Sequence, residues 1–165
     1  MGVAGAGKST VMAELAGRLG WRTLEGDTLH PAANVTKLMA GTPLTDEDRR
    51  PWLDAIAAWI RQGAEAAEPS IVTCSALRRR YRDVLRAAAG GVIFVHLVAP
   101  PDVLATRMAR RAGHFMPPDL LASQLALLEA LDDEPGFSVD ATRSPAAIAD
   151  EVLEHLGRPR RRRTP

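Results

Sequence analysis

Eight residues near the start of the chain constrain its fold more than any other stretch. The run Gly2–Ser9 reads GVAGAGKS and has the spacing G-x-x-x-x-G-K-[ST]. This spacing is typical of a loop between a strand and a helix, in which backbone N–H groups and the lysine surround a chain of phosphates. A glycine-rich helix start without a ligand is the less favoured alternative. The run therefore predicts an α/β domain with a polyphosphate site at a helix N-terminus.

The rest of the chain alternates helical and strand-like segments, which is the pattern of a parallel sheet covered by helices. Helical periodicity or capping residues occur at 9–19, 31–40, from Thr45 onward, 77–89, 102–111, 119–129 and around 148–156. Short apolar runs predict strands at 22–25, 70–74, 91–97 and 137–139. We therefore expect one α/β domain over residues 1–157.

Composition excludes several classes of protein. The chain has 165 residues, of which 46% are hydrophobic, and this suits one domain with a real core. We find no apolar run of membrane-spanning length and no signal peptide, so we expect a cytoplasmic protein with no membrane partner. Cys74 is the only cysteine, which excludes an internal disulfide and a cysteine-rich zinc site.

The last eight residues, 158–165, carry five arginines, so the residues before them sum to about −4 although the whole chain has a net charge of +1. Such a charge run predicts a basic, disordered tail. Nucleic-acid binding is the less favoured alternative, because the tail contains no interleaved aromatic residues.

Two acids follow the first predicted strand. Glu25 and Asp27 are two residues apart, and acids at the carboxyl end of a strand face the crevice where open α/β sheets bind ligands. One can lie near a metal ion while the other accepts the proton of a substrate hydroxyl. The open alternative is that Asp27 or Thr28 only caps the next helix. The Ser9 hydroxyl suits Mg²⁺.

Other polar residues help to choose among reactions. Cys74 and Ser75 end the strand at 70–74, where switch and motor hydrolases carry a magnesium-binding acid, so hydrolysis is disfavoured. Arg107 and Arg111 share a helical face before the loop 113–118, and such a pair suits a lid that closes over a transferred phosphoryl group. A solvated basic surface is the alternative reading of this pair.

The chain resembles the thermoresistant gluconokinases, which are P-loop kinases similar to nucleoside-monophosphate kinases. Five segments carry the likeness in family order: GVAGAGKST, EGDTLHP, GTPLTDEDRRPWL, CSALRRRYRD and RAGHFMPPDLLASQLALLE. The resemblance implies a three-layer α/β/α fold with strand order 2-3-1-4-5, a lid at about 111–118 and a homodimer. It also implies phosphorylation of D-gluconate at the 6-hydroxyl, with ATP and Mg²⁺ as partners, to give 6-phospho-D-gluconate.

The resemblance also assigns roles to residues. It implies a nucleotide site at Gly2, Val3, Ala4, Gly5, Ala6, Gly7, Lys8, Ser9 and Thr10. It implies catalytic roles for Lys8, Asp27, Arg107 and Arg111, and a magnesium site at Ser9 and Glu25. It implies an acceptor pocket at Asp27, His30, Arg49, Arg78, Tyr81, His114 and Gln124. The alternatives are a shikimate-type or nucleoside-monophosphate kinase and a non-catalytic nucleotide-binding protein.

The segment before the glycine-rich loop departs from the family pattern. In this fold the loop follows a buried central strand of about five residues, and here only Met1 precedes Gly2. We therefore expect a hole in the middle of the sheet, with unpaired backbone groups on both sides. We also expect that the natural protein begins upstream of Met1. A product that begins at Met1 is expected to be poorly stable and to bind ATP weakly.

Overall fold

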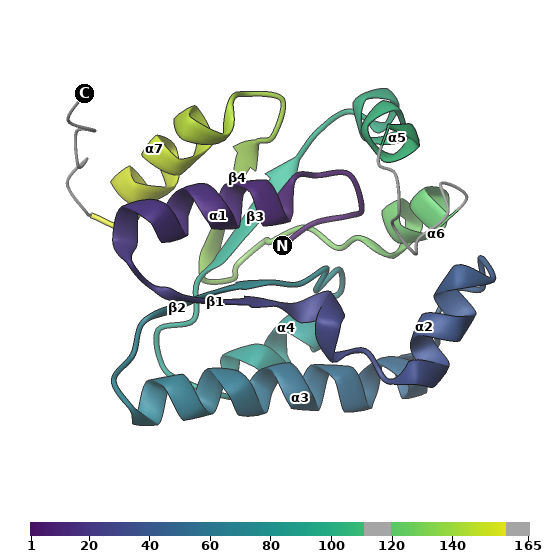
Figure 1. Cartoon of the computed structure of the whole chain (residues 1–165), viewed down its shortest axis with the longest axis horizontal. Helices are drawn as coiled ribbons and strands as arrows, with labels where there is room; N and C mark the ends of the chain where they lie inside the picture. Colours follow the sequence, from purple (N-terminus) through teal and green to yellow (C-terminus); the bar gives the residue numbers. More distant parts are fainter. Residues whose placement is uncertain (111–119, 158–165) are drawn as a thin grey trace.

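The computed structural model describes residues 1–110 and 120–157 (Figure 1). Each expected helix and strand is present, with ends that differ by a few residues. Along the chain the elements are α1 (Lys8–Leu19), β1 (Arg22–Glu25), the 3-10 turn η1 (Gly26–Leu29), α2 (Ala32–Met39), α3 (Asp46–Glu65), β2 (Ser70–Thr73), α4 (Arg79–Arg86), β3 (Phe94–Val98), α5 (Pro101–Ala109), α6 (Leu120–Leu127), β4 (Gly136–Asp140) and α7 (Pro145–His155).

Local signals explain where two of the helices begin. The hydroxyl of Thr45 accepts a hydrogen bond from the backbone N–H of Asp48, and the Asp48 carboxylate accepts one from the N–H of Thr45. This reciprocal pair is the capping box that the sequence predicts, and it starts α3. Helix α4 begins at Arg79, later than expected, because Ala76 has a φ of +42° and Arg78 is extended.

The strands form two parallel pairs, β1 with β2 and β3 with β4. Helices α1 and α7 pack together over one face of these strands, and α3 and α4 pack together over the other (Figure 1). The expected three-layer α/β/α fold is therefore confirmed. The lid predicted at 111–118 and the tail at 158–165 lie outside the described residues. No helix in the described ranges is long and apolar enough to span a membrane.

The start of the chain lies in the centre of the molecule, between the two strand pairs (Figure 1). The N–H of Gly2 donates to the carbonyl of Ser75 at 3.2 Å on one side, and the N–H of Leu97 donates to the carbonyl of Met1 at 3.0 Å on the other. Met1 and Gly2 thus lie at the position of the last residues of a central strand.

Beside these two residues lies a cavity of about 650 Å³, lined by Met1, by both inner strands and by apolar side chains of α1, α3 and α7. The hole expected in the middle of the sheet is therefore present. The amino group of Met1 is buried here and donates to the carbonyl of Val95 at 2.5 Å. Burial lowers the pKa of this amine from 8.0 to about 5, because a charged group is poorly solvated in the interior.

Candidate active site

The glycine-rich run forms the loop that enters α1. Gly7 has a φ of +89° and is the N-cap residue of this helix, and Gly5 has a φ of +78°. A Cβ atom on Gly5 would lie 2.8 Å from the carbonyl oxygen of Leu104, whereas a Cβ on Gly7 would meet no described atom within 4 Å. Gly5 is therefore required for close packing against α5, whereas at Gly7 the positive φ favours glycine at the start of α1. The first N–H groups of a helix such as α1 favour a phosphate.

Lys8 folds back onto its own loop. Its ammonium group donates to the carbonyl oxygens of Gly2 and Val3, each at 3.0 Å. The side chain thus lies along the inner side of the loop, where the helix dipole and the ammonium act on the same anion.

The two acids Glu25 and Asp27 line a second cavity, of about 750 Å³, together with Lys8 and the glycine-rich loop. The carboxylate of Glu25 accepts a hydrogen bond of 2.5 Å from the hydroxyl of Thr73, which fixes its orientation. Asp27 belongs to the turn η1 instead of an extended strand end. Helix α2 has Pro31 as its N-cap residue, so neither Asp27 nor Thr28 caps it. The capping alternative is thereby wrong, although both acids still face one cavity.

Trp52 of α3 holds this turn in place. Its indole N–H donates to the carbonyl of Gly26 at 2.8 Å, and its ring stacks on His30 at 4.3 Å between centroids. Burial lowers the pKa of His30 to about 4, with a smaller effect of the same sign from Arg49, so the imidazole is neutral near pH 7. The sequence predicts Trp52 only as a core residue, because its position in the apolar stripe of the helix gives no sign of this second role.

Arg49 is the most unusual cation of the site. Only 7% of its surface is exposed, and its Nε atom is buried without a hydrogen-bond partner among the described residues. Burial lowers the pKa of its guanidinium, since the charge has lost its water. A buried, incompletely paired guanidinium that lines a cavity is suited to an anionic ligand.

Helix α3 begins beside a second group of cations around Asp46. The Asp46 carboxylate accepts hydrogen bonds from Arg80 and from the hydroxyl of Tyr81, and its oxygen lies 3.7 Å from Arg78. These contacts lower the pKa of Asp46, with the Tyr81 hydrogen bond as the largest cause. The ring of Tyr81 lies under Arg49, at 5.7 Å. Arg78 and Tyr81 therefore lie directly behind the cavity wall that Arg49 forms.

One cavity of about 750 Å³ brings most of the predicted site together. The predicted residues that line it are Ala4, Gly5, Ala6, Gly7, Lys8, Ser9, Thr10, Glu25, Asp27, His30, Arg49, Arg107 and Gln124. Gly2, Val3, Arg78 and Tyr81 are not among its lining residues, and Arg111 and His114 lie outside the described residues. The two acids Glu25 and Asp27, the glycine-rich loop and residues that follow β4 all contribute to its lining.

Sequence reasoning missed several lining residues. Ser75 lies in a segment that carries the family resemblance, so that segment could have identified it. Arg143 follows β4 in the stretch VDATRSPAAIADEVLEHL, which also resembles the family, but nothing in that stretch singles this arginine out. Arg107 reaches the same region, where its guanidinium donates to the carbonyl of Ala141 at 2.9 Å. The loop after β4 thus lines the same cavity as the two acids.

The oxygen donors of the cavity fit a magnesium ion. The Ser9 hydroxyl and the Glu25 carboxylate line it together with Lys8, and oxygen atoms are the ligands that Mg²⁺ prefers. No cluster of three or more acids, histidines or cysteines that could hold a metal occurs within residues 1–110 and 120–157. This donor set suits an ion that takes most of its ligands from phosphates and water.

Comparisons with known proteins agree with this geometry. The family described as "AAA domain" matches residues 1–131. Gluconokinase from Gluconobacter oxydans (strain 621H) is 49% identical over 157 residues, which cover 94% of this chain and 88% of that protein. Thermoresistant gluconokinase from Escherichia coli (strain K12) is 40% identical over 156 residues, which cover 93% and 85% of the two chains.

A solved structure gives the same result. A gluconokinase from Sinorhizobium meliloti 1021 has a TM-score of 0.84 to this chain at 46% identity, and the match covers 95% of this chain and 89% of that one. The protein is therefore a kinase, and it belongs to the gluconokinase family of P-loop kinases.

Proposed function

We propose that the protein transfers the γ-phosphoryl group of ATP to the 6-hydroxyl of D-gluconate, giving 6-phospho-D-gluconate and ADP. One observation carries the proposal: a single cavity contains the glycine-rich loop with Lys8, the carboxylate of Asp27 and the buried guanidinium of Arg49. These three features suit a polyphosphate, a hydroxyl and a carboxylate. The names of the relatives, which are gluconokinases, support the same substrate.

The chemistry of the lining residues supports an arrangement of the two substrates. The phosphates lie on the glycine-rich loop, the nucleoside extends towards the residues after β4, and the acceptor lies on the side of Asp27 and Arg49. In this arrangement the carboxylate of gluconate pairs with Arg49, because a guanidinium fork matches a carboxylate. The neutral ring of His30 and other polar groups then contact the row of hydroxyls.

The transfer itself needs little covalent chemistry from the protein. Asp27 orients the 6-hydroxyl and accepts its proton while the oxygen bonds to the γ-phosphorus and the bond to the β-phosphate oxygen breaks. Lys8 and the N–H groups of the loop stabilise the charge that develops on the phosphate oxygens. Arg107 supplies a further positive charge beside the nucleotide. Ser9 and Glu25 would hold Mg²⁺, which neutralises phosphate charge when it is bound.

The experiment is to measure ADP release with gluconate, shikimate, AMP and other sugar acids as acceptors. We expect turnover with gluconate alone. We expect Lys8→Ala and Asp27→Asn to reduce kcat by about a hundredfold or more, because each removes a group that acts at the reacting atoms. Turnover with AMP or shikimate but not with gluconate would refute the proposal. The family likeness also favours a homodimer, which sedimentation of the purified protein can test.

A further inference from the structure

The side chain of Gln124 reaches from α6 into the glycine-rich loop. Its Oε1 atom accepts a hydrogen bond of 2.7 Å from the backbone N–H of Ala4, which is 120 residues away in the sequence. The glutamine is 8% exposed, and the contact is buried. A buried N–H group needs a partner, so this acceptor contributes to the conformation of the loop.

Gln124 and Lys8 bind the two polar groups of the same peptide bond. The peptide group between Val3 and Ala4 donates its N–H to Gln124, and its carbonyl accepts from the Lys8 ammonium at 3.0 Å. A peptide group is planar, so its N–H and C=O turn together. The acceptor of Gln124 therefore also fixes the direction of the carbonyl to which Lys8 is bound.

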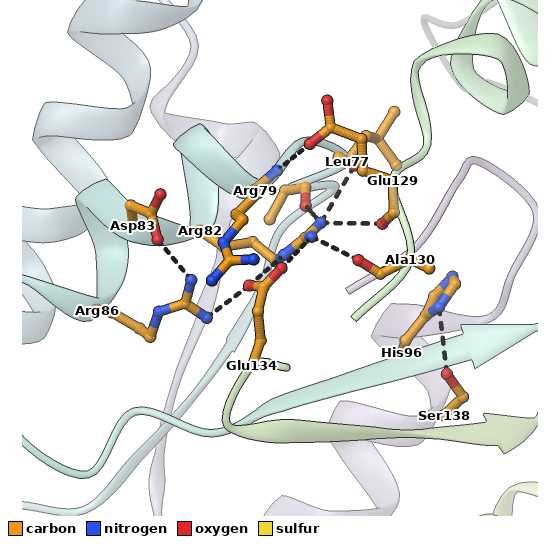
Figure 2. A network of polar contacts seen from close by, with 11 residues as sticks. Leu77, Arg79, Arg82, Asp83, Arg86, His96, Glu129, Ala130, Glu134 and Ser138 are labelled. Carbon is orange, nitrogen blue, oxygen red and sulfur yellow. Dashed lines mark hydrogen bonds and ion pairs between the residues drawn. The ribbon is translucent and has the colours of Figure 1, made fainter. Parts of the chain in front are cut away.

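The segment that follows α6 is attached to the β2–α4 connection (Figure 2). The N–H of Glu129 donates to the carbonyl of Leu77 at 2.8 Å, and the Glu129 carboxylate accepts from the N–H of Arg79 at 2.6 Å. The guanidinium of Arg82 donates to the carbonyls of Glu129 and Ala130 from inside the protein. The segment after α6 is thus anchored by contacts outside the glycine-rich loop that Gln124 contacts.

We propose that Gln124 is a positioning residue of the nucleotide site, which holds the Val3–Ala4 peptide so that Lys8 is placed for the β- and γ-phosphates. The inference rests on the proposed function only in that ATP is the phosphoryl donor, because the expected effect is on ATP binding. It differs from the acceptor-pocket role that the family resemblance implies for Gln124. The two roles affect different substrates, so kinetics can separate them.

The test compares Gln124→Met and Gln124→Leu with the wild type. Both replacements fill space without an acceptor, and using two guards against poor packing of either one. We expect the KM for ATP to rise about tenfold, as fits an unpaired buried N–H group, while the KM for gluconate changes less than twofold. Ser123→Ala is the matched control, because that hydroxyl donates to the carbonyl of Leu120 in its own helix, and both constants stay unchanged in it.

A second measurement examines the route through Lys8. ATP binding is titrated without gluconate in the wild type, Gln124→Met, Lys8→Ala and the double variant. If Gln124 acts through Lys8, its replacement weakens ATP binding about tenfold in the wild type and less than twofold in the Lys8→Ala background.

Additive losses in this cycle would overturn the inference. A higher KM for gluconate with an unchanged KM for ATP would overturn it too, and so would unchanged constants or an equal rise in both. The titration requires no acceptor. The ATP-binding result can therefore be interpreted even if gluconate is not phosphorylated.

Discussion

In the proposed function, recognition of the acceptor depends most directly on the side chain of Arg49. Its side chain lines the cavity, and its Nε atom is buried without a hydrogen-bond partner among the described residues, so the charge of the guanidinium is poorly compensated. Arg50, the next residue, has an exposed side chain and pairs with Asp54 at 3.3 Å on the surface of α3. These neighbours have the same chemistry and opposite environments.

We predict that Arg49→Lys raises the KM for gluconate about ten- to hundredfold and leaves the KM for ATP within twofold. Lysine keeps the charge but loses the planar fork that matches a carboxylate. Steady-state kinetics with each substrate varied in turn measures the split. Arg50→Lys should behave as the wild type, and an equal effect of both replacements would argue against a carboxylate contact at Arg49.

At the scale of elements, α4 is joined to the segment before β4 by a buried ion pair (Figure 2). The side chains of Arg82 and Glu134 are 0% and 1% exposed and approach to 2.5 Å, and Arg86 contacts the same carboxylate at 2.6 Å. The hydrogen bond from Arg82 is the main cause that lowers the pKa of Glu134 to about 2. Removal of one partner of such a pair leaves an unpaired buried charge.

We predict that Glu134→Gln lowers the free energy of unfolding at pH 7 by about 3–5 kcal/mol. The pKa of Glu134 lies below its ordinary 4.5, so the carboxylate stabilises the fold fully above that pH and progressively less as the pH falls towards about 2. The difference between wild type and variant in urea unfolding should therefore shrink below pH 4.5.

Asp83→Asn is the control for this substitution, since Asp83 pairs with the same Arg86 but is 57% exposed. It should cost less than about 1 kcal/mol. Equal losses in the two variants would show that burial of the pair at Glu134 has no special effect.

How far the sequence predicts each element depends on the range of the interactions. Helices and strands follow from local periodicity and capping, and their order is correct. The arginines of α4 show the limit: Arg79, Arg80 and Arg82 look alike in the sequence, yet Arg82 is fully buried and the other two are exposed. The partners that distinguish Arg82 include Glu134 and the carbonyls of Glu129 and Ala130, all far along the chain. The contact between Gln124 and Ala4 is equally non-local, which is why the sequence gives no sign of it.

At the scale of the whole molecule, the gap between β2 and β3 is the main weakness. A cavity of about 650 Å³ separates two strand pairs that would otherwise form one sheet, and the Met1 amine is buried beside it. Lost packing and unpaired strand edges both reduce stability.

We predict that the free energy of unfolding rises with pH between about 5 and 8. The Met1 amine has a native pKa of about 5 against an ordinary 8.0, so the unfolded chain binds more protons in this window. His30 and His96, whose pKa values burial lowers to about 4, contribute in the same direction up to pH 6.5. N-terminal acetylation removes this amine. The free energy of unfolding, measured in urea, should then change less with pH above pH 6.5 and should be about 1 kcal/mol higher at pH 7. If the free energy of unfolding rose with pH equally in the acetylated and unacetylated chains, the Met1 amine would not be its cause.

The gap itself gives another prediction. An N-terminal extension of five apolar, β-branched residues should raise the melting temperature by several degrees, because it can fill the cavity and pair with both inner strands. A glycine and serine extension of equal length is the control and should add little. Equal melting temperatures for the two extensions would show that the gap does not accept a strand.

The most direct measurement is phosphorus–proton correlation NMR of the product made from ATP, magnesium and D-gluconate. We predict a phosphomonoester coupled to the two protons on C6 of gluconate, formed in equal amount with ADP, and absent from the Asp27→Asn reaction. ADP with free inorganic phosphate, or a phosphate on another oxygen, would contradict the placement of the acceptor hydroxyl between Asp27 and the phosphates on the glycine-rich loop.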